Sequence, residues 1–174
     1  EWGKLFNSGK LFSDWLEAAE SVSNREQIEL AYNGLLLRAE QPAYLSALTH
    51  KVNIIAFAED WCPDVIRHVP VLQKLADASS KIEVRYLSRM NAPEIFSRYL
   101  TNGGEAIPKF IFFNDSFVEF ANWGPMPSEC RKLIAQGKAR NDVATARKKV
   151  AALYEVDHEK QLVIHELIEL IELC

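Results

Sequence analysis

The stretch that decides the fold runs from Val52 to Pro70 and reads V-N-I-I-A-F-A-E-D-W-C-P-D-V-I-R-H-V-P. Its first part, Val52 to Phe57, is an apolar, β-branched run with the length and composition of a buried strand. A short polar link follows and leads to Trp61-Cys62-Pro63. Proline is common at the first helical position, because its missing N–H would be unpaired there anyway. The stretch therefore predicts a strand, a tight turn and a helix that begins directly after Cys62.

The place of Cys62 in this pattern predicts a reactive thiol. A helix N-terminus carries roughly half a positive charge and unpaired N–H groups, and both favour a thiolate over a thiol. Glu59, Asp60 and Asp64 are near in sequence, and their negative charges favour the protonated form. We expect an accessible Cys62 whose pKa is modestly below that of a free cysteine. The alternative is a small buried apolar residue, as free cysteine often is.

Three short sequence motifs, and the spacing between them, resemble those of the thioredoxin superfamily. Trp61-Cys62 follows a buried strand, and Pro70 stands eight residues beyond the cysteine, as in the superfamily's active-site turn. Ile107-Pro108 precedes the apolar run of residues 109–113 as the superfamily's cis-proline precedes its second central strand. Gly124 is placed like the glycine after the next hairpin strand. The resemblance covers about residues 51–133 and implies an α/β thioredoxin-like fold, a central mixed β-sheet flanked by helices, with N- and C-terminal helical extensions.

The chain departs from this resemblance at two positions. Its motif reads Cys-Pro-Asp-Val, so Val65 stands where a dithiol thioredoxin has the resolving cysteine that frees the product. Ala56 stands where thioredoxins bury an acid that handles the proton of that thiol. Both parts of the resolving step are missing together. Ordinary dithiol disulfide reduction is therefore not expected.

Two functions remain open. In the first, a monothiol redox protein, Cys62 is catalytic and forms mixed disulfides with a protein or a low-molecular-weight thiol or disulfide. An external thiol, or less favourably Cys130 or Cys174, would resolve them. In the second, a redox-inactive binding module keeps the thioredoxin groove around Trp61, Cys62 and Pro108. An iron–sulfur cluster of the monothiol glutaredoxin type is a distant third, because the Cys-Gly-Phe-Ser turn is absent.

The resemblance also implies a substrate groove beside the thiol, formed by Trp61, Pro63, Ile107, Pro108 and Gly124. The backbone of Ile107 would offer a strand-like edge to an extended peptide. Each of these residues has a simpler interpretation. Trp61 could pack under the turn, and Ile107-Pro108 could only end a loop.

No metal and no cofactor are expected. Asp64 and His68 stand four residues apart on the predicted helix, a spacing that can hold a metal. Such a pair is more often a solvated ion pair or hydrogen bond. The other histidines, His50, His158 and His165, form no ligand set.

Composition bounds the class of protein. The chain has 174 residues, of which 48% are apolar and 25% charged, which is ordinary for a folded domain. A net charge of −4 argues against a nucleic-acid partner. No apolar run approaches the roughly 18 residues of a membrane span. Three cysteines without paired spacing suit a reducing compartment, so we expect a cytoplasmic protein. Whether a leader preceded Glu1 stays open.

We expect three segments: an N-terminal helical extension packed on the domain (1–50), a thioredoxin-like core (51–136) and a C-terminal helical extension (137–174). Within the core the patterns predict strands at 52–57, 82–87, 109–113 and 117–120, with helices at 63–78 and 93–100. Pro42 is expected to interrupt the first extension, and Gly137 the helix that begins at Ser128. The amphipathic tail, 162–173, predicts an intramolecular cover or a dimer contact, so the oligomeric state stays open.

Overall fold

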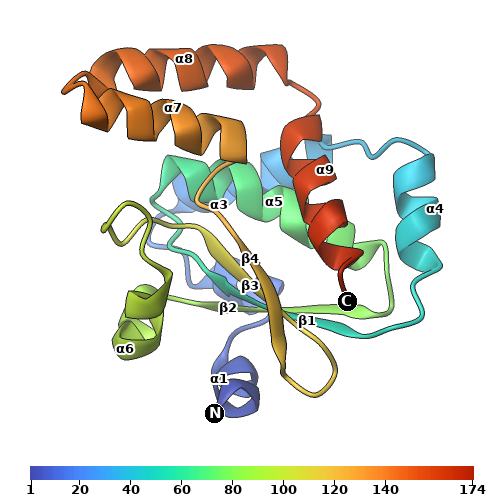
Figure 1. Ribbon diagram of the computed structural model, residues 1–174. Helices are drawn as coiled ribbons and strands as arrows, with labels where there is room; N and C mark the ends of the chain where they lie inside the picture. The colour runs from blue at the N-terminus through green and yellow to red at the C-terminus, as the bar shows by residue number, and fades with distance from the viewer.

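Strand β1 (Val52–Phe57) lies inside the sheet and is buried along its whole length. The computed structural model describes residues 1–174, and its sheet has the order β2-β1-β3-β4 (Figure 1). The other strands are β2 (Ile82–Leu87), β3 (Lys109–Phe113) and β4 (Glu119–Trp123). β1 pairs parallel with β2 and antiparallel with β3, which pairs antiparallel with β4. A strand covered on both faces needs a continuous apolar run, and β1 has one.

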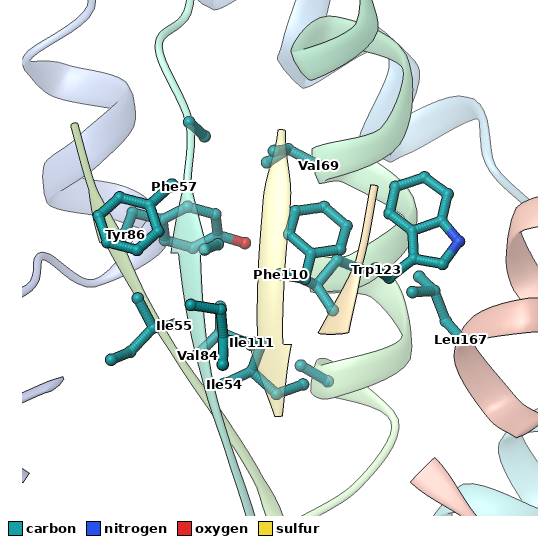
Figure 2. Packing of buried hydrophobic residues seen from close by; sticks show 14 of the residues in the cluster. Ile54, Ile55, Phe57, Val69, Val84, Tyr86, Phe110, Ile111, Trp123 and Leu167 are labelled. Carbon is teal, nitrogen blue, oxygen red and sulfur yellow. The ribbon is translucent and has the colours of Figure 1, made fainter. Parts of the chain in front are cut away.

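Helices α5 (Pro63–Asp77) and α9 (Gln161–Ile171) cover one face of the sheet. The ring of Trp123 stacks on Phe110 at 5.2 Å between centroids, and Figure 2 shows it between β4 and Leu167 of α9. The Tyr86 hydroxyl donates to Gln73 of α5 at 2.9 Å. The apolar side of α9 is therefore used within the chain, which favours the intramolecular cover that the sequence predicts for the tail.

Helices α1 (Trp2–Ser8) and α6 (Pro93–Phe96) contact the opposite face. Phe96 packs edge-on against Phe57 at 5.2 Å, and Trp2 lies 4.8 Å from the ring of Phe113. The sheet is thus a mixed sheet between helices, as the sequence predicts for a thioredoxin-like α/β fold. No helix in the structure combines the length and the apolarity that crossing a membrane requires.

The remaining helices surround this core. They are α2 (Phe12–Glu17), α3 (Val22–Gly34), α4 (Glu40–Ser46), α7 (Ser128–Ala139) and α8 (Val143–Val156), with short 3-10 turns at Arg89–Asn91 and Ser97–Tyr99. α3 packs along α5, while α7 and α8 form an antiparallel hairpin at the top of Figure 1. The N-terminal segment also reaches the sheet, because the backbones of Lys10 and Tyr86 exchange two hydrogen bonds of 2.9 Å.

Two predicted boundaries of the core are wrong. β4 begins at Glu119 and not at Phe117, because Phe117 has φ = 57°, a left-handed conformation that no strand contains. The side chain of Asn114 accepts the N–H groups of Ser116 and Val118 at 3.0 Å and so lengthens the turn. The helix predicted at 93–100 is α-helical only to Phe96 and continues as a 3-10 turn.

Two predicted helix breaks are also wrong. Pro42 lies in the first turn of α4, where a backbone N–H has no intrahelical partner to lose. Gly137 is buried inside α7, and a Cβ atom there would lie 2.5 Å from the Cβ of Ala146 in α8. The glycine therefore allows the two helices to approach closely. The hairpin turns after Ala139, and the side chain of Asp142 caps α8 by accepting the Thr145 N–H at 3.2 Å.

Candidate functional site

Cys62 is the N-cap residue of α5, and Pro63 begins the helix. The side chain of Cys62 is half-buried beside Trp61, which is 47% exposed. The Cys62 thiol donates to the carbonyl oxygen of Ile107 at 3.6 Å. The Ile107–Pro108 bond is cis. The fold thus brings three segments together at the sulfur of Cys62: the end of β1, the start of α5, and the loop of Ile107 and Pro108, called the proline loop below.

The pKa of Cys62 is shifted in the opposite direction to the one that its place at a helix N-terminus predicts. Burial raises the pKa of the Cys62 thiol above its ordinary value. The N–H groups of Val65 and Asp64 donate to the sulfur and lower the pKa, the charge of Asp64 raises it, and that of Arg89 lowers it. This direction is opposite to the acidified thiol that the sequence predicts. Desolvation outweighs the helix N-terminus, whose stabilising effect reaches at most about 2 kcal/mol in partly buried sites.

Two of the three acids near Cys62 are engaged elsewhere. Glu59 forms a two-pronged ion pair with Arg89, with N–O distances of 2.8 and 3.1 Å. The buried carboxylate of Asp60 accepts the backbone N–H of Glu20 at 3.0 Å and the side-chain amide of Asn24 at 2.8 Å. Asp60 thereby fixes the start of α3. Asp64, which accepts a hydrogen bond from Tyr154, is the acid whose charge raises the pKa of the thiol.

No second thiol stands where a resolving cysteine would. Val65 and Ala56 are both fully buried apolar residues, and all three cysteines are free. Cys130 is buried in the first turn of α7, and burial raises its pKa to about 11. Cys174 is exposed at the C-terminus, and its thiol donates to the Lys51 carbonyl at 3.6 Å. Cys62 is thus the one cysteine that lies both at the start of α5 and against the proline loop.

Gly124 supports the proline loop from behind. It has φ = 116°, and a Cβ atom at this position would lie 2.1 Å from the carbonyl oxygen of Pro108. The amine of buried Lys109 donates to the Gly124 carbonyl at 2.8 Å and to the Thr101 hydroxyl at 3.1 Å. Burial, with a smaller contribution from the charge of Arg131, lowers the pKa of Lys109 to about 8. Gly124 therefore holds the loop in place and does not line the pocket in front of it.

A pocket of about 590 Å³ opens beside the Cys62 turn. Its near wall includes Trp61, Pro63 and Ile107, three residues that the sequence assigns to a groove. Its far wall comes from the α7–α8 hairpin and consists of Arg131, Ile134, Lys138, Val143, Arg147 and Val150. Sequence reasoning missed this second wall. Its signal is the helical spacing within 131, 134, 138 and within 143, 147, 150, which puts each set on one helix face.

Asp64 and His68 form part of a half-buried polar network centred on Tyr154 of α8. The Tyr154 hydroxyl donates to Asp64 at 3.1 Å and lies 3.1 Å from Nε2 of His68, which is 3.6 Å from Asp64. Arg67 stacks on the Tyr154 ring at 4.0 Å and donates to the carbonyls of Tyr154 and Asp157. Burial lowers the pKa of His68. The Tyr154 hydroxyl, which contacts both Asp64 and His68, therefore joins α8 to the start of α5.

The sheet order, the single cysteine at the start of α5 and the proline loop against it define a protein of the thioredoxin fold. The thioredoxin family profile matches residues 9–144, and the chain belongs to this family. No curated protein matches the chain.

Solved structures agree on the fold. A protein of unknown function from Pseudomonas aeruginosa is similar with a TM-score of 0.78 and 16% identity, over 99% of this chain and 97% of that one. An HIV epitope scaffold is similar with a TM-score of 0.74 and 17% identity, over 99% of this chain and 98% of that one. At such identities the likeness concerns the fold alone.

Proposed function

We propose that this protein is a monothiol member of the thioredoxin family, which binds an extended segment of a partner beside Cys62 and forms a mixed disulfide with it. The observation that carries the proposal is the contact between the Cys62 thiol and the Ile107 carbonyl. The N–H of Ile107 donates no hydrogen bond within the chain, so it is free to pair with the backbone of a bound segment. A segment paired with Ile107 would present its own sulfur to Cys62.

The reaction is thiol–disulfide exchange. Cys62 releases its proton to water, and the thiolate attacks one sulfur of the partner's disulfide. A bond forms between Cys62 and that sulfur while the partner's disulfide breaks, and the second partner sulfur leaves as a thiolate that takes up a proton. A low-molecular-weight disulfide would react in the same way. Because burial raises the pKa of Cys62, the thiolate is scarce at neutral pH and the reaction is slow.

The mixed disulfide persists under this proposal. Val65 cannot attack it, and buried Cys130, with a pKa raised to about 11, is a poor nucleophile. An external thiol then has to release the partner, as the free cysteines and a reducing compartment would allow. The protein would hold a partner covalently and would not reduce one disulfide after another.

A second candidate is a redox-inactive binding module that uses the same groove. The raised pKa of Cys62 favours it, as do Val65 and Ala56, which leave no machinery for turnover. Both functions need the groove around Trp61, Cys62 and Pro108, but only the first needs the thiol to react.

Intact-mass spectrometry separates the two. The reduced protein is incubated at pH 8 with an excess of a peptide that contains one disulfide, and the free peptide is then removed. Every protein in the comparison carries Cys174→Ser, because the exposed thiol of Cys174 would react as well. In this background we expect one peptide adduct with Cys62 present, none with Cys62→Ser, and loss of the adduct on addition of reduced glutathione. Peptide binding without an adduct when Cys62 is present would favour the binding module and exclude the monothiol reaction.

A further inference from the structure

The pocket beside Cys62 carries a positive charge in a protein that is negative as a whole. The chain has a net charge of −4, yet Arg131, Lys138 and Arg147 line this pocket together with a single carboxylate, that of Asp64. Asp64 already accepts a hydrogen bond from Tyr154. The pocket therefore has more positive charge than its own acid neutralises.

The three pocket cations have no partners within the protein. None of them forms an ion pair or a side-chain hydrogen bond. The Nε atom of Arg131 is buried without a partner, and the charge of Arg131 lowers the pKa of nearby Lys109. Buried donors are almost always paired in folded proteins, so this nitrogen takes its acceptor from water or from a ligand in the pocket.

The remainder of the pocket is apolar and faces the proline loop. Ile134 of α7 and Val143 and Val150 of α8 lie on the far wall, opposite Trp61 and Ile107. A volume of about 590 Å³ lies inside the range of about 300–1,000 Å³ that is usual for ligand sites. The pocket thus offers apolar surface for side chains and cations for negative groups.

The spacing of the cations fits an extended chain. Arg131 and Lys138 are seven residues apart on α7, which is about 10 Å along a helix. In an extended peptide, residues that point to the same side repeat about every 7 Å. The difference of about 3 Å lies within the reach of flexible lysine, arginine and glutamate side chains, so alternate acidic residues of one strand-like segment can contact both cations.

We propose that the partner segment is acidic, and that the α7–α8 hairpin selects it through Arg131, Lys138 and Arg147. This inference rests on the proposed function, because it specifies what the groove beside Cys62 binds. The charge is supplied by the hairpin, whereas the thiol and the Ile107 edge are supplied by the sheet domain.

Fluorescence anisotropy with two synthetic peptides tests it. One fluorescein-labelled peptide alternates alanine and glutamate over ten residues, and the other alternates alanine and glutamine. The variant Lys138→Gln/Arg147→Gln removes two pocket cations. The control Lys132→Gln/Lys148→Gln removes two exposed cations from the same helices, neither of which lines the pocket. Circular dichroism checks that both variants are folded.

We expect the glutamate peptide to bind the wild type at least about fivefold more tightly than the glutamine peptide at low salt. The pocket variant should lose that preference, and the control should keep it. Three results would overturn the acidic preference and leave the groove proposal intact. They are equal affinity of the wild type for both peptides, an equal loss of preference in the control variant, and displacement of the labelled glutamate peptide by free glutarate as effective as that by unlabelled peptide at the same carboxylate concentration. Binding of neither peptide would contradict the groove proposal itself.

Discussion

The Sγ atom of Cys62 lies 3.6 Å from the carbonyl oxygen of Ile107, although 45 residues separate the two in sequence. A hydrogen bond from a thiol to a carbonyl favours the protonated form, and burial of the side chain raises the pKa of Cys62 in the same direction. The site therefore places Cys62 where a bound segment would lie and holds it in its less reactive form.

Val65→Cys should convert the protein into a partial disulfide reductase. A thiol at this position, one helical turn after Cys62, can attack a mixed disulfide and release the product. Ala56 leaves the new thiol without a buried base, so recovery should be incomplete, at about tenfold above wild type in an insulin reduction assay. Val65→Ser is the matched control and should stay inactive. If the wild type already matched Val65→Cys, then Cys130 or Cys174 would be resolving the mixed disulfide.

Tyr154→Phe should destabilise the protein by about 1–3 kcal/mol in urea unfolding. The change removes the hydroxyl that bridges Asp64 and His68, and it leaves the fully buried His68 ring without its partner. Tyr32→Phe is the control, because the hydroxyl of Tyr32 donates to Asp77 in an exposed position and its loss should cost less than about 1 kcal/mol. Equal losses in both variants would show that the network does not link α8 to α5.

Gly124→Ala should cost about 3 kcal/mol or more, because the new Cβ would lie 2.1 Å from the Pro108 carbonyl oxygen at a φ of 116°. Gly34→Ala is the control, since a Cβ there meets nothing within 4 Å, and it should be neutral or slightly stabilising. Thermal unfolding measures both. A Gly124→Ala variant as stable as the wild type would mean that the proline loop is not held at this point.

Lys109 should make stability rise with pH above about 8. Its pKa is lowered from 10.5 to about 8 in the folded protein, so between these values the unfolded chain binds more protons and deprotonation favours folding. Relative to Lys109→Met, the wild type should gain up to roughly 2 kcal/mol between pH 7.5 and 9.5, at about 1.4 kcal/mol for each pH unit in the titrating range. The cysteines and tyrosines have raised pKa values and make stability fall as pH rises. Their contribution is the same in both proteins and cancels in the comparison. A constant difference between the two proteins would contradict a buried charged Lys109.

The strands that have a regular apolar pattern could be predicted from the sequence. β1, β2 and β3 have the predicted bounds, because each is a continuous or alternating apolar run. β4 could not be placed, because its start depends on the left-handed conformation of Phe117 and on the side chain of Asn114. The division of the chain at residues 50 and 136 stays a prediction.

The candidate site could be predicted in part. Pro63 after Cys62 was enough to place the cysteine at the start of a helix. The direction of its pKa shift was not accessible, because desolvation depends on which segments cover the sulfur after folding. The cationic wall was missed for a related reason. Its position depends on how closely α8 approaches α7, and that approach is set by buried Gly137.

The central claim is that burial raises the pKa of Cys62 above that of the unfolded chain, and the rate of Cys62 alkylation against pH tests it most directly. Iodoacetamide labelling followed by peptide mapping measures Cys62 separately from Cys130 and Cys174, and the urea-unfolded protein supplies the reference titration. The account predicts a midpoint for native Cys62 above that of the unfolded chain. A native midpoint below the unfolded one would show that the helix N-terminus dominates and would contradict the account.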